Sequence, residues 1–297
     1  MFNKGLVIFN AFDVFDEYHH MFSRLFEEFK KYNISLDNKQ NNQVLAYLNE
    51  NGEVKTKDLP YDFIIYLDKD YYLAKMLEKA GYKLFNNAEA IRICDDKMLT
   101  HLTLANNNIK MPKTINFPLR YYSSQYDIFL NNVIKELGFP MIVKEIYGSL
   151  GEQVHLVNNK EELFDLEAKI YKRPHIYQEY IKSSKGKDIR MVVINKKYVT
   201  NMNRIAQDKN EFKSNIETGG IGVKIIPDKK YIEVAEKVAK IIDLDYCGLD
   251  LLIGENNEPI LCEVNANAYL SPIEKFSGDN VAKVYVDYIY NTIYKNN

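Results

Sequence analysis

The sequence predicts a mixed fold, in which a small parallel α/β unit precedes two segments of the α+β type. Two observations carry this prediction. In the first 95 residues, apolar runs of strand length alternate with amphipathic helical stretches, which is the order typical of a parallel sheet. Beyond residue 183, several strand-length runs follow one another closely, and the last two are joined by the turn residues Asn256-Asn257, as in a hairpin.

The first unit, residues 1–95, is expected to contain three strands and two helices. They are a buried strand at 5–12, a helix at 17–31, a buried strand at 62–67, a helix running to residue 80 and a short strand at 82–85. Asp68 or Asp70 can cap the second helix, and Gly81 should end it. No strand is predicted in the polar stretch 33–42. No GxGxxG turn is present, so a dinucleotide site is not expected.

Two further units are predicted, with boundaries near residues 95 and 182. A helix at 95–107 leads into the second unit, residues 96–182. Its elements are a helix ending at 138, strands at 140–146 and 153–157, a helix at 160–170 and a strand at 175–181. The third unit, residues 183–297, should contain strands at 188–195 and 197–203, a polar loop at 207–220, a helix at 229–243, strands at 246–253 and 259–264, and a helix at 280–294.

Composition excludes several classes of function. Hydrophobic residues make up 46% and charged residues 27% of the chain, as in ordinary soluble globular proteins. The net charge of −2 creates no field that would recruit nucleic acid or an anionic membrane, so neither partner is expected. Three cysteines without a CxxC pair argue against a disulfide scaffold. The first apolar run is broken at Asn10 and Asp13, unlike a signal peptide. We expect a cytoplasmic protein, and the composition is compatible with a homo-oligomer.

The most informative motif is Glu263-Val264-Asn265, at the end of an apolar run. Glu263 and Asn265 should point to the same face, because side chains alternate along a strand. If the hairpin pairs in simple register, Asp250 can lie across from them. Two carboxylates and an amide oxygen suit Mg²⁺ held against a nucleotide, with Mn²⁺ able to substitute. The alternative is an acidic strand end facing solvent, which the apolar neighbours disfavour.

A second motif suits a triphosphate. Lys144 ends the apolar run at 141–143 and is followed by the glycine-containing turn 148–151. The ammonium would neutralise charge, and glycines let backbone N–H groups approach phosphate oxygens. The turn is not a P-loop, because GxxxxGK[ST] is absent. Lys97, in a helix, is a further candidate. For both lysines the alternative is a solvated surface side chain.

Charged residues recur on the strands of the third unit. Asp188 and Arg190 share one face of a strand, and Arg204 ends the next strand, where a guanidinium could clamp a transferring phosphoryl group. The alternative for both arginines is ion pairing on an exposed sheet face. The junction after residues 178–181 could hold a purine, and the loop 212–215 offers a lysine and an amide.

The order of these motifs resembles the ATP-grasp superfamily, specifically the RimK-like amino-acid and peptide ligases. The resemblance is strongest over residues 140–282. The matched segments are FPMIVKE (139–145), the glycine loop (148–151), QEYIKSSKGKDIR (178–190), NRIA (203–206), FKSN (212–215), GLDLL (248–252) and EVNAN (263–267). Such a resemblance implies an ATP-grasp fold, preceded by a small parallel α/β domain.

It also implies roles for the matched residues. The phosphates of ATP would be bound by Lys97, Lys144, Gly148, Ser149 and Gly151. The adenine and ribose would lie by Glu179, Tyr180 and Ile181, with Asp188 nearby. The nucleotide pocket would also be lined by Lys213, Ser214 and Asn215. Mg²⁺ would be bound by Asp250, Glu263 and Asn265, and Arg204 would lie beside the transferring phosphate.

The implied activity is ATP-dependent ligation of a carboxylate to an amine, through an acyl phosphate. The acceptor could be a small molecule, a peptide or a protein, and the added group glutamate or another amino acid. A graspetide-type macrocyclase and a non-catalytic ATP-binding module are the alternatives. A D-Ala–D-Ala-type ligase fits less well, because QEYI…DIR and FKSN are typical of RimK-like ligases.

Three differences from the family pattern are present. Lys213 replaces the arginine of an FRSN-type loop, so a bidentate contact would become a point charge. Asn203 stands where an acid is frequent, and Ile205 where a second arginine is common. Asn267-Ala268-Tyr269 replaces Ser-Pro-Gly. We expect the last two differences to lie where the carboxylate and the amine meet, so they concern the substrate rather than ATP.

Overall fold

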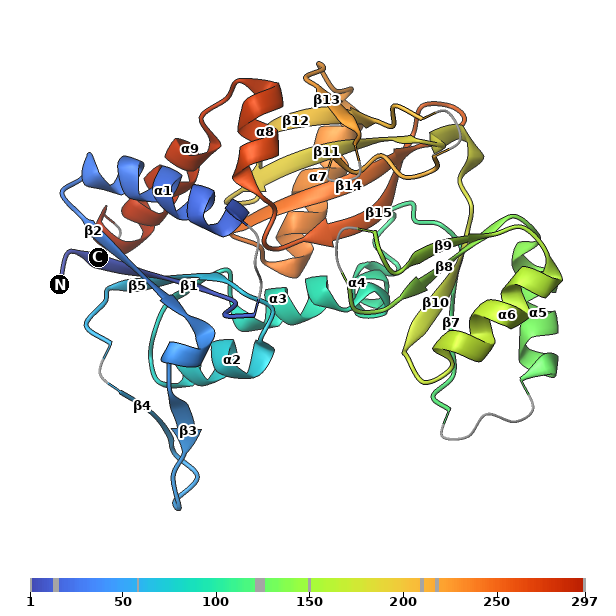
Figure 1. Ribbon diagram of the computed structural model, residues 1–297. Helices are drawn as coiled ribbons and strands as arrows, with labels where there is room; N and C mark the ends of the chain where they lie inside the picture. The colour runs from blue at the N-terminus through green and yellow to red at the C-terminus, as the bar shows by residue number, and fades with distance from the viewer. Residues whose placement is uncertain are drawn as a thin grey trace.

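The computed structural model contains three β-sheets and a small two-stranded hairpin (Figure 1). It describes residues 2–12, 16–57, 59–120, 126–148, 151–208, 211–216 and 219–295. None of the helices in these ranges is long and apolar enough to cross a membrane.

The first sheet is parallel, in the order β2-β1-β5-β6. Its strands are β1 (Lys4–Phe9), β2 (Ser35–Gln40), β5 (Phe63–Leu67) and β6 (Leu84–Phe85). The flanking helices are α1 (Asp16–Lys30) and α2 (Tyr71–Lys79). All five residues of β5 are buried, as the apolar run predicts for a strand covered on both faces. The parallel α/β prediction is therefore confirmed. Asp70, not Asp68, caps α2, because its side chain accepts from Leu73 N at 3.1 Å.

The polar stretch 33–42 was expected to contain no strand, and this expectation is wrong. It contains β2, an edge strand in which Leu36 alone is buried, so no apolar pattern marks it. A hairpin of β3 (Ala46–Leu48) and β4 (Val54–Thr56) follows and projects from the molecule (Figure 1). The single helix expected at 95–107 is instead two helices, α3 (Ala88–Asp95) and α4 (Lys97–Leu104). Asp96 separates them and caps α4.

The second sheet is antiparallel, in the order β7-β10-β8-β9. Its strands are β7 (Thr114–Asn116), β8 (Met141–Glu145), β9 (Val154–Val157) and β10 (His175–Glu179). The helices α5 (Asp127–Leu137) and α6 (Lys160–Ile170) cover it. A hydrophobic cluster confined to residues 117–177 forms its core. This part of the chain therefore packs as a body of its own.

The third sheet is antiparallel, in the order β13-β12-β11-β14-β15. Its strands are β11 (Lys187–Ile194), β12 (Lys197–Ile205), β13 (Ile221–Val223), β14 (Tyr246–Ile253) and β15 (Pro259–Asn265). The helix α7 (Lys229–Ile242) covers one face, and α8 (Leu270–Ser277) and α9 (Val281–Tyr290) pack on the other. β13 and α8 were not predicted, since both are short.

The first and third sheets share their hydrophobic cores. Two buried clusters each combine side chains from the first 109 residues with side chains from beyond residue 189. Asn86 joins the two parts: its Oδ1 accepts from Asp245 N (2.6 Å) and Tyr246 N (3.0 Å), and its Nδ2 donates to Tyr246 O (2.7 Å) and Ala266 O (2.9 Å). The division at residues 95 and 182 stays a prediction.

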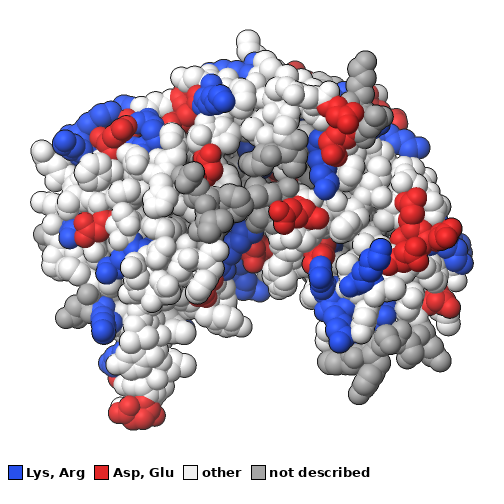
Figure 2. All heavy atoms as spheres, in the orientation of Figure 1, with Lys and Arg blue, Asp and Glu red and all other residues white. Residues whose placement is uncertain are grey.

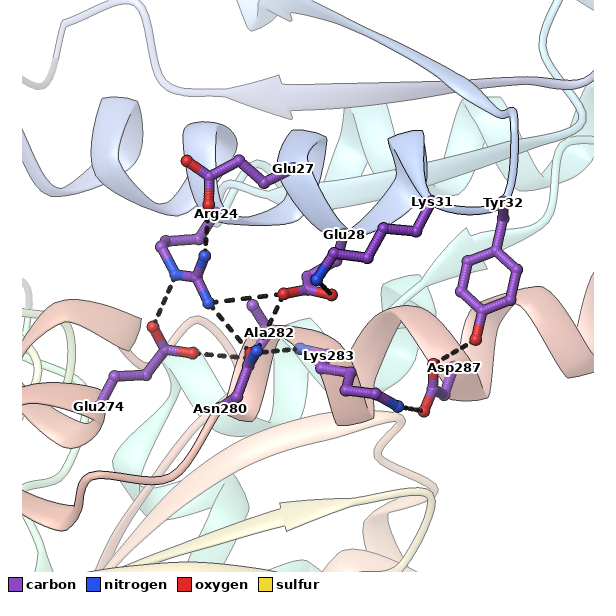
Figure 3. Close-up of polar contacts among 10 residues, drawn as sticks. All are labelled: Arg24, Glu27, Glu28, Lys31, Tyr32, Glu274, Asn280, Ala282, Lys283 and Asp287. Atoms are coloured by element: carbon purple, nitrogen blue, oxygen red, sulfur yellow. Dashed lines mark hydrogen bonds and ion pairs between the residues drawn. The ribbon is translucent and has the colours of Figure 1, made fainter.

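Polar contacts also tie α1 to the C-terminal helices (Figure 3). Arg24 donates to Glu274 Oε2 at 2.9 Å and to Asn280 Oδ1 at 3.0 Å, and the Tyr32 hydroxyl donates to Asp287 Oδ1 at 2.6 Å. The two ends of the chain therefore form one body, from which the second sheet projects (Figure 1).

Candidate active site

A cavity of about 590 Å³ lies where the three sheets meet. Figure 2 shows the corresponding face hollowed between its two parts, with lysine and arginine side chains near the hollow. The predicted site residues that the structure describes all line this cavity. They are Lys97, Lys144, Gly148, Gly151, Glu179, Tyr180, Ile181, Asp188, Arg204, Lys213, Ser214, Asn215, Asp250, Glu263 and Asn265. Ser149 lies outside the described residues.

Four charged side chains form a cluster on the cavity face of the third sheet. The strand register places Asp188 opposite Arg204, and Arg190 opposite Asp250. Arg204 Nε donates to Asp188 Oδ1 at 2.7 Å, and Arg204 Nη2 contacts Asp250 Oδ2 at 2.9 Å. Arg190 donates twice to Asp250, each time at 2.7 Å. Arg204 is 2% exposed, so these pairs are not on an exposed sheet face.

Electrostatics hold this cluster in one arrangement. Burial raises the pKa of Asp250, but the charges of Arg190 and Arg204 outweigh it and hold that pKa well below its usual range. A bidentate contact also fixes the plane of a guanidinium. The side chain of Arg204 is therefore oriented before any ligand arrives.

The predicted metal ligands lie on the hairpin of β14 and β15. Asp250 is paired directly with Glu263, and Gly248 with Asn265, while a bulge follows Asp250. Glu263 Oε1 lies 3.8 Å from Lys97 Nζ. The buried Nδ2 of Asn265 has no hydrogen-bond partner within the described part of the chain. The same ranges hold no group of three or more His, Cys, Asp or Glu suited to a metal. The set of two carboxylates and one amide nevertheless fits a hard cation.

Lysines from different elements converge on the glycine turn. Lys97, the first residue of α4, donates to the carbonyl oxygens of Ile146 and Gly148, each at 3.3 Å. Lys213 Nζ donates to Gly151 O at 2.6 Å. Burial lowers the pKa of Lys97, against the opposing effect of Glu263. Gly151 has φ +74°, so the left-handed backbone there favours glycine.

Lys144 contacts a residue that the sequence analysis did not assign to the site. Its Nζ lies 3.5 Å from Cys262 Sγ, and both residues line the cavity. Gln178, buried beside the predicted purine segment 179–181, also lines the cavity. Its Nε2 donates to Thr114 Oγ1 at 2.9 Å. Gln178 begins the matched segment 178–190 but was not among the predicted site residues, and Cys262 precedes the motif 263–267 and reads as an ordinary strand position.

At one end of the cavity, only Asn267 and Tyr269 were expected from the sequence. It is formed by residues that follow β1 and β5, by α1 and by the chain after β15: Asn10, Phe12, Tyr18, Asp68, Lys69, Asn267 and Tyr269. Asn10 and Asp68 follow the carboxyl ends of adjacent parallel strands, a frequent place for ligands. That rule could have identified them.

One expectation about the substrate region is wrong. Asn203 and Ile205 were expected near the meeting point of carboxylate and amine, but neither is among the described residues that line the cavity. Side chains alternate along β12, so Arg204 faces the cavity while its two neighbours face the other side. Asn267 and Tyr269 do line it, as expected.

Comparisons with known proteins identify the family of this chain. Residues 94–289 match the RimK-like ATP-grasp domain. An uncharacterized protein of Mycoplasma genitalium is 31% identical over 224 residues, which are 74% of this chain and 77% of that protein. Human N-acetylaspartylglutamate synthase A is 33% identical over 225 residues, 74% of this chain and 56% of the synthase. A RimK domain protein from Sphaerobacter thermophilus has a similar solved structure, with a TM-score of 0.70 at 17% identity, covering 96% of this chain and 99% of that one.

The fold and the cavity define an ATP-grasp ligase, an enzyme that uses ATP to form carbon–nitrogen bonds. The protein belongs to the RimK-like ATP-grasp family. Members of this fold bind ATP, and one solved structure of the same fold, an ATP-grasp ligase 15% identical with a TM-score of 0.68, contains Mg and ADP.

Proposed function

We propose that this protein joins a carboxylate to an amine through an acyl phosphate, with ATP and Mg²⁺. The observation that carries the proposal is the convergence in one cavity of Arg204, three lysines and the acidic hairpin of β14 and β15. Such a constellation can neutralise a triphosphate and a transferring phosphoryl group.

In the first step, a carboxylate oxygen of the substrate attacks the γ-phosphorus of ATP, and the bond to the bridging oxygen breaks to release ADP. In the second step, the amine nitrogen attacks the acyl carbon, inorganic phosphate leaves, and the nitrogen loses a proton. Both steps depend on positioning and charge neutralisation, so no nucleophilic side chain is needed.

Each residue then has a definite task. Lys97, Lys144 and Lys213 would move from the contacts they make now to the phosphate oxygens, with Gly148, Ser149 and Gly151 offering backbone N–H groups. The purine and ribose would lie against Glu179, Tyr180 and Ile181, near Asp188, with Ser214 and Asn215 completing the pocket. Asp250, Glu263 and Asn265 would hold Mg²⁺, or Mn²⁺, which neutralises phosphate charge. Arg204, already oriented by two carboxylates, would contact the transferring phosphoryl group.

The names of the relatives suggest amino-acid ligation. N-acetylaspartylglutamate synthase and β-citrylglutamate synthase both name a product that contains glutamate, and the human enzymes are 33% and 32% identical to this chain. We propose that this protein adds glutamate or another amino acid to a small molecule, a peptide or a protein. A graspetide-type macrocyclase or an ATP-binding module without catalysis are the alternatives.

Hydroxylamine offers a test that does not require the natural amine. With Mg²⁺, ATP and a panel of carboxylates, hydroxylamine should trap the acyl phosphate as a hydroxamate, with release of ADP. Mass spectrometry identifies the carboxylate. If the protein binds ATP but releases no ADP with any carboxylate, candidate peptides included, the non-catalytic ATP-binding module is favoured. A cyclised peptide product would favour the macrocyclase.

A further inference from the structure

Gln178 is held by two side chains that lie behind the wall of the cavity. It belongs to β10, is 1% exposed and lines the cavity. Its Nε2 atom lies 2.9 Å from Thr114 Oγ1, on β7, and 3.0 Å from His101 Nε2, on α4. Neither Thr114 nor His101 is among the described residues that line the cavity. They can therefore act on a ligand there through Gln178.

The hydrogen bonds of His101 show which way the Gln178 amide faces. His101 Nδ1 lies 2.7 Å from the carbonyl oxygen of Lys97, and a carbonyl oxygen can only accept, so Nδ1 carries a proton. The pKa of His101 lies below its usual range because burial outweighs the hydrogen bond to Lys97 O, and the charge of Lys144 lowers it further. The ring is therefore neutral at pH 7, and its Nε2 atom is an acceptor. The Gln178 atom that meets it must be the nitrogen.

Thr114 requires the same orientation of the amide. Its hydroxyl donates its single proton to the carbonyl oxygen of Pro112 at 2.8 Å. Thr114 Oγ1 can therefore only accept from Gln178. Two carbonyl oxygens on different segments, those of Lys97 and Pro112, thus fix the Gln178 amide in one orientation.

The amide oxygen of Gln178 remains for a ligand. Both N–H groups of Nε2 are taken by His101 and Thr114, and no described residue donates to Oε1. Oε1 is not one of the described side-chain atoms that are buried without a partner, so it keeps access to solvent. Because Gln178 lines the cavity, the wall presents a hydrogen-bond acceptor of fixed direction there. An amide that could rotate would offer a donor equally well.

The surroundings of Gln178 suit a flat apolar ring with a phosphate tail. The strand register places Gln178 opposite Ile142, which also lines the cavity, and Ile181 and Leu252 add apolar surface. Lys144 follows two residues after Ile142 on the same face of β8, roughly 7 Å further along the strand and toward the glycine turn. A nucleotide whose base packs on Ile142 can therefore place its phosphates at Lys144.

We propose that His101 and Thr114 are positioning residues, which hold the Gln178 amide so that its oxygen faces a bound purine. The pocket then selects a purine with an amino group at C6, a donor, over a purine with a carbonyl at C6, an acceptor. Two facing acceptors repel, and the Gln178 oxygen would lose the hydrogen bond that water otherwise supplies. The inference rests on the proposed use of ATP and assigns part of its base selectivity to two residues outside the cavity.

Calorimetry with ADP and IDP, each with Mg²⁺, tests this inference. The two nucleotides differ only in the six-membered ring of the base, where IDP has a carbonyl at C6 and a hydrogen on N1. We expect the wild type to bind ADP at least about tenfold more tightly than IDP. Equal binding would overturn the inference, whereas a protein that binds neither nucleotide would overturn the ligase proposal on which it rests.

Variants assign the preference to the orientation of the amide, because backbone groups of residues 179–181 could also contribute to it. His101→Phe keeps a flat ring but removes the acceptor, and Thr114→Val keeps the shape of the side chain but removes the hydroxyl. The ratio of the two affinities should fall in each single variant, and at least about threefold in the double variant, because the amide can then turn an N–H group toward IDP. His101→Gln can place an amide oxygen where Nε2 lay, and should retain the wild-type ratio. His20→Phe is the matched control, because His20 is exposed and is not among the cavity-lining residues.

The affinity ratio separates this role from a purely structural one. If His101 and Thr114 only supported packing, the variants would lose affinity for ADP and IDP by the same factor. An unchanged ratio in the double variant would therefore overturn the inference. Thermal unfolding followed by circular dichroism shows whether each variant is folded. If a variant at His101 does not fold, Thr114→Val, on a different element, carries the test with the same readout.

Discussion

Lys213 Nζ donates a hydrogen bond of 2.6 Å to the carbonyl oxygen of Gly151, and both residues line the cavity. Lys213 belongs to the loop after β12, and Gly151 to the turn before β9. The contact therefore joins the third sheet to the separately packed second sheet. A phosphate would compete with this carbonyl for the same ammonium, so nucleotide binding and the position of the turn should be coupled.

Removal of this contact should loosen both segments. Lys213→Met is expected to increase amide hydrogen exchange in residues 151–157 and 211–216, while the ATP analogue with Mg²⁺ should decrease it in the wild type. Hydrogen exchange followed by mass spectrometry measures both effects. Lys237→Met, on the exposed face of α7, is the control. Unchanged exchange in both segments on nucleotide binding would contradict a closing site.

Substitutions of the two carboxylates proposed to bind Mg²⁺ should affect activity and stability differently. Glu263→Gln is expected to abolish ADP formation with little loss of stability, because its ion pair with Lys97 is long and partly exposed. Asp250→Asn should also abolish activity, but at a cost of about 3–5 kcal/mol, because it breaks a buried pair with Arg190 and Arg204. Coupled ADP assays and urea titrations measure these effects, with Glu255→Gln as the control. If Glu263→Gln turned over at the wild-type rate, the assignment of Glu263 as a metal ligand would be wrong.

Arg204 should act mainly in the transition state. Arg204→Lys keeps a charge but loses the bidentate geometry, so turnover should fall by on the order of 3 kcal/mol, about a hundredfold, with a smaller change in ATP affinity. Steady-state kinetics and calorimetry give the two values. If turnover and ATP affinity fell equally, Arg204 would contribute to binding of ATP in the ground state rather than to the transition state. The matched control is Arg173→Lys, whose ion pair with Glu145 lies at the surface.

Lys144 should contribute to ATP affinity. Its replacement by Ala removes a charge-assisted phosphate contact, which we expect to cost about 1.5–3 kcal/mol in ATP binding. Lys229→Ala, at a side chain that is 88% exposed, should leave the affinity unchanged. Calorimetry with the ATP analogue distinguishes the two variants. If both bind equally well, Lys144 belongs to the cavity wall but not to the nucleotide site.

Asn86 should matter for stability alone. Asn86→Ala leaves buried backbone groups of Asp245, Tyr246 and Ala266 without their partner, so unfolding should become easier by about 3 kcal/mol or more. Asn51→Ala, in the exposed turn of the β3–β4 hairpin, is the control. A urea titration measures both. A loss below about 1 kcal/mol would mean that the shared cores, rather than Asn86, hold the first and third sheets together.

Local sequence patterns were sufficient to predict an element wherever its own apolar residues show which of its faces are buried. The hairpin of β14 and β15 was predictable because apolar runs flank a polar turn, and its register brings Asp250 opposite Glu263. The edge strand β2 was not, because a strand with a single buried residue has no apolar periodicity. The same reason applies to β13, whose two outer residues are exposed.

The sequence by itself determined the mixed fold, the family and the residues expected to hold ATP, because motif order along the chain carries that information. The tertiary structure alone decided which surfaces face one another. It brought Asn10 and Asp68 together after two parallel strands, and it placed Asp68 beside Asn267, 199 residues further along the chain. Packing between distant elements sets such contacts, and no local pattern of residues encodes them.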